Sequence, residues 1–150
     1  MEYVLVTGAY GGMGRAVAKA MKNAGYFVFA LDKNVEEAEE NLLPIQADIT
    51  DKDSLEKAFS LVQSQTDKLT AILHFAGIYM LDSLVEIDED KFRRAFEINL
   101  FGVYQINKIF LPLLQKGSRI LLTTSELAPL APLPFTGLYA ITKSALDKYA

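Results

Sequence analysis

Short apolar runs alternate with longer segments of mixed polarity along the whole chain. An uninterrupted apolar run of roughly four to eight residues is typical of a buried strand, whereas apolar residues spaced three and four apart are typical of a helix. On this basis we predict five strands, in residues 3–8, 26–32, 43–50, 69–77 and 118–125.

The segments between these runs predict helices. The expected helices cover residues 14–25, a short acidic and solvated stretch at 34–42, a segment from a cap at Asp51 or Asp53 to about Gln65, residues 89–114, and a last segment that begins at Leu138. Asp88 is a suitable N-cap for the long helix, and Pro112 should kink or end it. Between the fifth strand and the last helix, Pro129, Pro132 and Pro134 exclude regular structure.

Strands that alternate with helices predict a parallel sheet with helices on both faces and right-handed crossovers. This is the doubly wound α/β class, in which ligands bind beyond the carboxyl ends of the strands. We expect a single domain over residues 1–150 with no internal repeat. The chain ends within the last helix and leaves the fifth strand as an uncovered edge, so we expect this domain to be incomplete at its C-terminus.

The composition narrows the classes of function. Hydrophobic residues make up 51% of the chain and charged residues 23%, as in an ordinary globular domain. The net charge of −4 and the lack of a basic stripe with interleaved aromatic residues argue against nucleic acid as a partner. The sequence has no cysteine, which excludes disulfides and thiolate metal sites, and we expect no metal. We see no signal peptide and no membrane-spanning apolar run, so we expect a cytoplasmic protein.

Four of the nine glycines lie between the first strand and the first helix, in the stretch TGAYGGMG that starts at Thr7. Glycines at this place let backbone N–H groups approach a pyrophosphate, and the helix N-terminus adds about half a positive charge. The spacing satisfies TGxxxGxG through Gly8, Gly12 and Gly14, and also TGxxGxxG through Gly11. The loop predicts a dinucleotide but cannot by itself decide between the two patterns.

Asp32 lies eighteen residues after Gly14, at the end of the second predicted strand. A carboxylate there accepts hydrogen bonds from the adenosine ribose and repels a 2′-phosphate, which favours NAD over NADP. The glycine loop contains no basic side chain, and this also supports NAD. Lys33 leaves NADP open because its ammonium could hold a phosphate.

The stretch YAITK places Tyr139 and Lys143 four residues apart, on one face of the last helix. A free phenol is a poor base at neutral pH, and about 4 kcal/mol is needed to make it an effective one. A single ammonium at about 4 Å supplies this order of energy at an effective dielectric near 20. The pair is therefore sufficient for acid–base work on an alcohol or carbonyl oxygen, although this spacing alone is common by chance.

Three polar residues could complete such a site. Ser125 ends the fifth predicted strand, where its hydroxyl could hold a substrate oxygen, and Thr124 is a possible substitute for it. Asn99 interrupts the apolar stripe of the long helix, so it is either a satisfied structural group or the holder of a water that relays protons to Lys143.

Together these residues resemble the short-chain dehydrogenase/reductase family over essentially the whole chain. The elements that carry the resemblance, in chain order, are TGAYGGMG, Asp32, ADIT, HFAG, INLFG, TTS and YAITK. The family implies a Rossmann-type sheet with strand order 3-2-1-4-5, further strands that this chain lacks, and NAD(P)-dependent interconversion of a secondary alcohol and a carbonyl. INLFG and YAITKSAL resemble the single-domain reductase branch of the family. That branch has the pattern TGxxxGxG, so the resemblance implies that Gly8, Gly12 and Gly14 form the cofactor loop and that Gly11 is not part of the pattern.

The resemblance implies a role for each site residue. Tyr139 is implied as the general acid/base, and Lys143 as the group that favours its deprotonated form and binds the nicotinamide ribose. Ser125 is implied to orient the substrate oxygen, and Asn99 to support a proton relay. The further implied cofactor contacts are Gly8, Gly12, Met13, Gly14, Asp32, Asp48, Ile49, Ala76 and Gly77.

The sequence departs from the family pattern in two places. HFAG stands where the family has N-N-A-G, and we interpret His74, the only histidine, as a structural hydrogen-bonding residue in place of asparagine. Ser125 precedes Tyr139 by fourteen residues, one more than the family spacing. The chain is also shorter than family members usually are, so we take it as the N-terminal part of a longer enzyme.

Two other functions stay open. A nucleotide-sugar epimerase or dehydratase of the same superfamily is favoured by Gly11 and His74, since that branch has TGxxGxxG and H-x-A-A. A dinucleotide-binding sensor or scaffold would have no need of Tyr139 and Lys143. The long helix is apolar on more than one side, at Phe101 for example, and the family commonly pairs this helix between subunits, so we expect a homodimer or homotetramer of the full-length protein.

Overall fold

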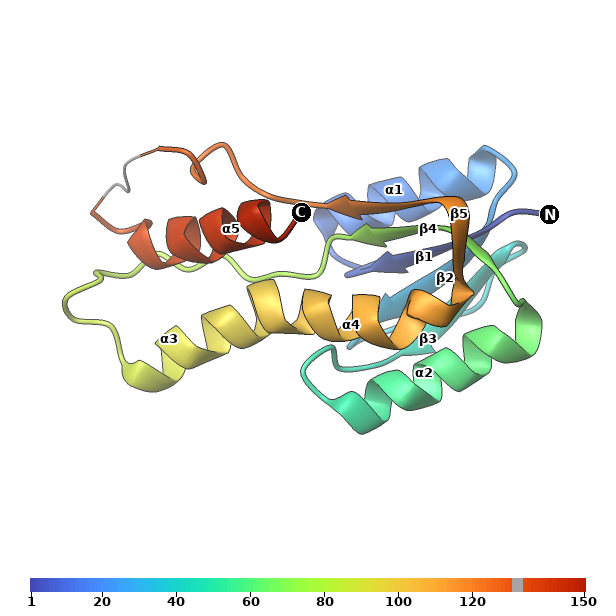
Figure 1. Ribbon diagram of the computed structural model, residues 1–150, viewed down its shortest axis with the longest axis horizontal. Coiled ribbons are helices and arrows are strands. Elements are labelled where there is room, and N and C mark those ends of the chain that lie inside the picture. The colour runs from blue at the N-terminus through green and yellow to red at the C-terminus, as the bar shows by residue number, and fades with distance from the viewer. Residues whose placement is uncertain (131–133) are drawn as a thin grey trace.

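The computed structural model describes residues 1–130 and 134–150, and these form a five-stranded parallel sheet with helices on both faces (Figure 1). The strands are β1 (Tyr3–Thr7), β2 (Phe27–Asp32), β3 (Leu42–Gln46), β4 (Leu69–His74) and β5 (Leu114–Leu122). Their order in the sheet is β3-β2-β1-β4-β5. The predicted fold class and strand order are confirmed.

Five α-helices connect or follow these strands. They are α1 (Gly12–Asn23), α2 (Lys52–Gln65), α3 (Glu89–Phe96), α4 (Gly102–Phe110) and α5 (Gly137–Tyr149). Asp51 caps α2 and Asp88 caps α3, each by accepting hydrogen bonds from two N–H groups of the first turn. Among the described residues, no helix combines the length and the hydropathy that a membrane crossing requires.

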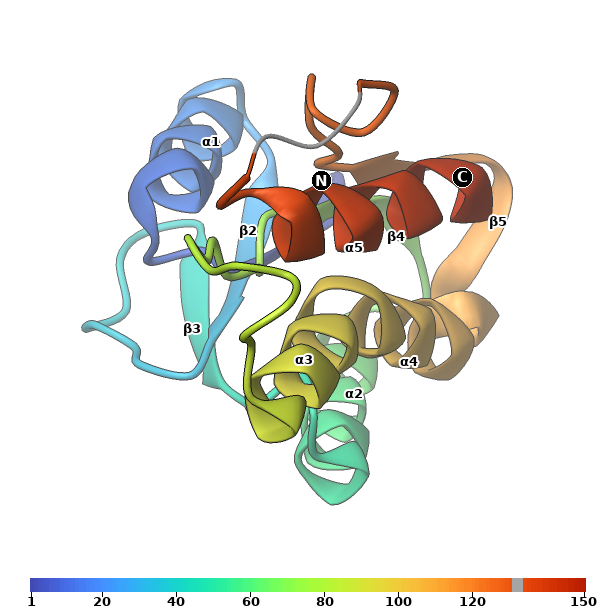
Figure 2. The same cartoon turned by 90° about the vertical axis from the view of Figure 1, so that its left-hand side faces the viewer.

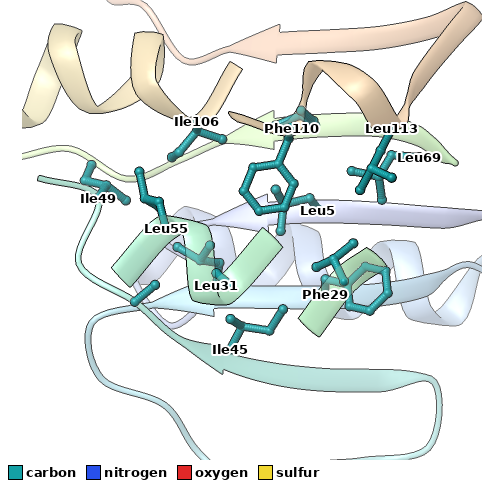
Figure 3. Packing of buried hydrophobic residues seen from close by; sticks show 14 residues of the cluster. Leu5, Phe29, Leu31, Ile45, Ile49, Leu55, Leu69, Ile106, Phe110 and Leu113 are labelled. Carbon is teal, nitrogen blue, oxygen red and sulfur yellow. The ribbon is translucent and has the colours of Figure 1, made fainter. Parts of the chain in front are cut away.

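The core lies in two layers because successive strand residues point to opposite faces of the sheet. On one face Leu5 and Phe29 pack with residues of α2 and α4, among them the fully buried Phe110 (Figure 3). On the other face Val4 and Val6 pack with residues of α1. The central strands are thus buried on both sides, and they hold the loops at their carboxyl ends on a rigid base.

The predicted acidic helix at residues 34–42 is wrong. The segment is irregular and closes in a turn at residues 39–42, where Asn41 has a positive φ of 59° just before β3 begins. Its glutamates would repel one another on a helix. They bind cations of α1 instead: Glu36 pairs with Arg15 and Glu39 pairs with Lys22.

The predicted single helix at residues 89–114 is interrupted. A π-helical turn, η1 (Glu97–Phe101), separates α3 from α4, and a 3-10 turn, η2 (Leu111–Leu113), contains Pro112 and ends the run as expected. Phe101 and Tyr104 are exposed, so this run does have a second apolar side. A subunit interface on that side stays a prediction.

The fifth strand starts and ends earlier than predicted. It runs from Leu114 to Leu122 and has an irregular register against β4 between Leu69 and Ala71. Gly117, with a φ of 96°, lies within this irregular part. Ser125 consequently lies in a turn three residues beyond the strand rather than at its end. The segment that follows is irregular where it is described, and Pro132 lies outside the described residues.

Candidate functional site

The carboxyl ends of β1, β2 and β4 lie at one edge of the sheet, beside a cavity of about 420 Å³. Figure 2 views the molecule from this edge, with α1 and α3 on opposite sides of the strand ends. The volume falls within the roughly 300–1,000 Å³ that is usual for small-molecule sites. Of the predicted cofactor contacts, the structure brings six to this cavity: Gly8, Asp32, Asp48, Ile49, Ala76 and Gly77.

The glycines of the loop differ in what surrounds them. Gly8 has a φ of 64°, and a Cβ there would lie 2.5 Å from the backbone nitrogen of Ala76. A Cβ on Gly14 would lie 1.9 Å from the carbonyl oxygen of Gly8. A Cβ on Gly12 would meet no protein atom within 4 Å, and Gly11 rather than Gly12 lines the cavity. Gly8 and Gly14 are therefore required by packing, while the fold itself does not require glycine at position 12.

The N-terminus of α1 suits an anion. The helix has no side-chain cap at Gly11 and no acidic residue in its first turn, so its first N–H groups and its dipole face the loop without a competing carboxylate. The open space beside Gly12 leaves room for a ligand atom to approach the backbone. The residues present thus fit the diphosphate of a dinucleotide.

Asp32 ties the glycine loop to the end of β2. Its carboxylate accepts hydrogen bonds from the N–H of Tyr10 at 2.9 Å and from the N–H of Asn34 at 3.2 Å. Each carboxylate oxygen can accept a second hydrogen bond. Asp32 can therefore also bind ribose hydroxyl groups from the cavity that it lines.

The cations near Asp32 have carboxylate partners. Lys33 Nζ lies 3.5 Å from Asp48, and the guanidinium of Arg15 lies 2.7 Å from Glu36. The hydroxyl and the N–H of Thr50 both donate to Asp48, and these hydrogen bonds hold the pKa of its carboxyl below the usual range. Asp48 consequently stays charged opposite Lys33 at neutral pH.

Helix α5 carries Tyr139 and Lys143. Lys143 is only 5% exposed, and burial lowers the pKa of its ammonium. Its Nζ donates to the carbonyl oxygen of Thr123 at 2.8 Å and lies 5.7 Å from the centre of the Tyr139 ring. The ring of Tyr79 meets the Tyr139 ring edge-on, with 4.7 Å between their centres. The loop after β5 and the loop after β4 thus hold the pair from two sides.

The sequence contains a second Tyr-x-x-x-Lys pair, which can be compared with Tyr139 and Lys143. Tyr104 and Lys108 on α4 have the same spacing, and Lys108 Nζ also lies 5.7 Å from the tyrosine ring centre. Both of these residues are exposed. The burial of Lys143 next to the cofactor edge of the sheet, and not the spacing, therefore distinguishes the candidate catalytic pair.

Asn99 is buried within the π-helical turn η1, a kind of turn that is frequent at functional sites. Its amide donates to the carbonyl oxygen of Ile78 and to the hydroxyl of Thr142, each at 3.0 Å, and its oxygen accepts from the N–H of Ile78 at 2.8 Å. A Cβ on Gly77 would lie 3.2 Å from the Asn99 oxygen and 3.6 Å from Lys143 Nζ. Gly77, Asn99 and Lys143 thus meet at one point.

Ser125 has a local partner in the structure. Its hydroxyl accepts a hydrogen bond from the N–H of Leu127 at 3.2 Å, as in a serine turn. Thr124, the substitute considered from the sequence, lines a different cavity together with α4. The structure therefore places Ser125 in the loop before α5, where its hydroxyl bonds to Leu127 rather than to Tyr139.

His74 is a buried structural residue at the end of β4. Its Nε2 lies 2.8 Å from the side-chain oxygen of Asn107 on α4. Burial lowers the pKa of His74 from 6.5 to about 4, so the ring is neutral at physiological pH and Nε2 is the donor. The hydrogen bond links the sheet to α4, in agreement with the structural interpretation of His74.

The lowered pKa of His74 makes the stability of the protein depend on pH. The pKa of His74 is 6.5 in the unfolded state and about 4 in the folded state. At a pH between these two values, the unfolded state binds a proton that the folded state does not. Stability should therefore fall as the pH falls, by roughly 2 kcal/mol between about pH 7 and pH 5. Urea unfolding at the two pH values measures this loss. His74→Asn should abolish most of it, and an equal loss in both proteins would contradict the assignment.

Sequence reasoning missed several residues of this site. Tyr10 and Arg94 line the cavity, Tyr79 packs on Tyr139, and Thr142 binds Asn99. Thr142 lies within the YAITK stretch and could have been found there. Tyr10 lies within TGAYGGMG and could have been found in the same way. Arg94 and Tyr79 carry no sequence signal, because their neighbours come from elements that are distant along the chain.

The sheet order and the loop at its carboxyl edge define a Rossmann-type α/β domain. The chain matches the short chain dehydrogenase family over residues 2–150. It belongs to this family.

Similar proteins are dehydrogenases and reductases. Estradiol 17-beta-dehydrogenase 2 from Mus musculus is 36% identical, over 98% of this chain and 42% of the relative. Versicolorin reductase from Emericella nidulans is 30% identical, over 99% of this chain and 60% of the relative. A short-chain dehydrogenase/reductase structure from Brucella melitensis is 27% identical with a TM-score of 0.91, over 99% of this chain and 66% of that one. The chain thus spans about half the length of these curated relatives.

Proposed function

We propose that the full protein is an NAD-dependent oxidoreductase that interconverts a secondary alcohol and a carbonyl. The observation that carries the proposal is the convergence of Gly77, Asn99 and the buried Lys143 beside Tyr139, next to a cavity that fits a dinucleotide. This arrangement supports the proposal because it would put an acid–base group within reach of the nicotinamide end of such a cofactor.

The chain's own residues would handle the proton. The Tyr139 hydroxyl would donate it to the carbonyl oxygen in reduction and accept it from the alcohol in oxidation. Lys143, fixed by the carbonyl oxygen of Thr123, would stabilise the tyrosine anion. Ser125 would hold the substrate oxygen, and Asn99, which fixes the backbone of Ile78, would support the return of the proton from solvent. The cofactor, when bound, supplies or accepts the hydride.

We propose NAD rather than NADP as the cofactor. Asp32 at the end of β2 would repel a 2′-phosphate. Lys33 and Arg15, the nearby cations, are paired with Asp48 and Glu36. At Lys33 and Arg15 a 2′-phosphate would have to compete with these carboxylates, whereas ribose hydroxyl groups need only donate hydrogen bonds to the Asp32 carboxylate.

We further propose a neutral, apolar substrate. A rim formed by two loops, one of which contacts Tyr139 through Tyr79, carries large exposed apolar side chains, namely Tyr79, Leu81, Leu84, Val85, Leu130 and Phe135. A hydrogen bond of 2.9 Å from the Asp82 N–H to the Phe135 carbonyl oxygen joins the two loops. Lys91, the cation near this rim, is paired with Asp82 at 3.3 Å. Apolar surface beside a cation that is already paired favours a bulky neutral ketone over a phosphate ester or an acid.

A ketone panel tests these proposals on the full-length protein. We expect NADH to support reduction at least about tenfold better than NADPH in kcat/KM. Among 2-decalone, cyclohexanone and 4-oxopentanoate, the bicyclic ketone should give the highest kcat/KM and the acid the lowest. No oxidation of NADH or NADPH with any ketone would contradict the oxidoreductase function.

A nucleotide-sugar epimerase or dehydratase is the second candidate, and the place of Gly11 in the cavity wall is the observation that favours it. Such an enzyme returns the hydride to the same sugar and shows no net consumption of NADH. Conversion of a nucleotide sugar at constant cofactor, together with inactivity on the ketones, would favour this candidate over the first.

A further inference from the structure

Helix α3 lies across the strand ends from α1 (Figure 2), and its Arg94 lines the cofactor cavity. Arg94 and Ile98 are four residues apart, on one helical face, and both line the cavity. The glycine loop contributes Gly8 and Gly11 to the same cavity. A ligand that fills the cavity therefore contacts the loop and the α3 side together.

The charges around this cavity leave one cation without a partner. The ionisable side chains of its wall that are charged at neutral pH are Asp32, Lys33, Asp48 and Arg94. Lys33 and Asp48 form an ion pair at 3.5 Å. In the part of the chain that the structure describes, no ion pair or side-chain hydrogen bond involves Arg94. Without Arg94 the wall would carry a net negative charge, which would repel an anionic ligand.

We infer that Arg94 binds the diphosphate of the dinucleotide from the side opposite the α1 N-terminus. This inference rests on the proposed cofactor. The N–H groups at the start of α1 would contact one side of a diphosphate, which leaves phosphate oxygens on its other side free to accept from a second donor. A guanidinium is suited to the other side because it is always charged and presents paired donors that match phosphate oxygens.

The neighbouring residue supplies a matched control. Arg93 has the same side chain on the same helix, but its guanidinium pairs with Glu89 at 2.7 Å and it does not line the cavity. Arg94→Gln and Arg93→Gln remove the same charge from adjacent exposed positions of α3. A change in the overall electrostatic field of the protein would alter ligand binding in both variants. Loss of a direct contact with the ligand would alter binding only in Arg94→Gln.

Equilibrium binding to the full-length protein, followed by calorimetry, tests the inference with NADH, ADP and adenosine as probes. Arg94→Gln should weaken the binding of NADH and of ADP about tenfold, as expected for the loss of one charged hydrogen-bond partner. It should leave the affinity for adenosine unchanged. Arg93→Gln should bind all three probes as the wild type does. The affinity of the wild type for ADP should also fall more steeply with salt than that of Arg94→Gln.

Two results would overturn the inference. One is equal affinity for ADP in Arg94→Gln and Arg93→Gln. The other is an equal loss of affinity for adenosine and for ADP in Arg94→Gln, which would mean that Arg94 contacts the adenosine part of the ligand. If the wild type binds neither NADH nor ADP, the proposed cofactor itself is wrong, and this outcome is distinct from failure of the Arg94 contact.

Discussion

Tyr139→Phe in the full-length protein should lower kcat for ketone reduction by about three orders of magnitude, within the usual range for loss of a general acid. The substitution removes the hydroxyl and keeps the ring, so the edge-on contact with Tyr79 is retained. NADH affinity should change by less than about twofold, because the phenol acts on the substrate oxygen. Steady-state kinetics and an NADH titration of the same preparation measure the two quantities.

Tyr104→Phe is the matched control, because Tyr104 has a lysine at the same spacing and distance. This pair is exposed on α4, away from the cofactor edge, and kcat should be unchanged. Equal losses of kcat in the two variants, or no loss in either, would remove Tyr139 from the mechanism. A lower melting temperature of Tyr139→Phe would show a structural effect instead.

Gly14→Ala should destabilise the fold by about 3 kcal/mol, the upper part of the range for overpacking. The new Cβ would lie 1.9 Å from the carbonyl oxygen of Gly8, and a backbone atom cannot move aside as a flexible side chain can. Either α1 or the glycine loop must shift. Urea unfolding with NADH absent measures the loss.

Gly12→Ala provides the contrast at a distance of two residues. Its Cβ would meet no protein atom within 4 Å, so stability should be nearly unchanged. NADH should bind more weakly, because the methyl group enters the space at the start of α1 that a diphosphate would use. The account of the loop is wrong if Gly12→Ala unfolds as easily as Gly14→Ala, or if Gly12→Ala binds NADH like the wild type.

The fold could be predicted from the sequence because its strands and helix ends are determined by residues that are close together along the chain. The apolar runs of β1, β2 and β4 are buried on both faces and leave little ambiguity, and Asp51 and Asp88 cap their helices through contacts within one turn. The glycine spacing, read together with YAITK, also indicated the place of the cavity before its walls were known.

The features that the sequence did not predict depend on contacts between segments that are distant along the chain. The stretch at 34–42 is irregular, and its Glu36 pairs with Arg15 of α1, a contact that no local pattern reveals. The π-helical turn at Asn99 and the early end of β5 depend on packing against Ile78 and β4. The sequence also contains two Tyr-x-x-x-Lys pairs, and only the burial of Lys143 separates the candidate catalytic pair from the one on α4.

We expect the full-length protein to transfer a hydride directly between NAD and a neutral carbonyl at the site that this chain carries. The most direct test is reduction of 2-decalone by the full-length protein with NADH deuterated at the transferable position of the nicotinamide. We expect deuterium on the carbinol carbon of the product, with NAD formed in equal amount, and loss of this product in Tyr139→Phe. NADH that binds to the protein but leaves no deuterium in any ketone of the panel would contradict it.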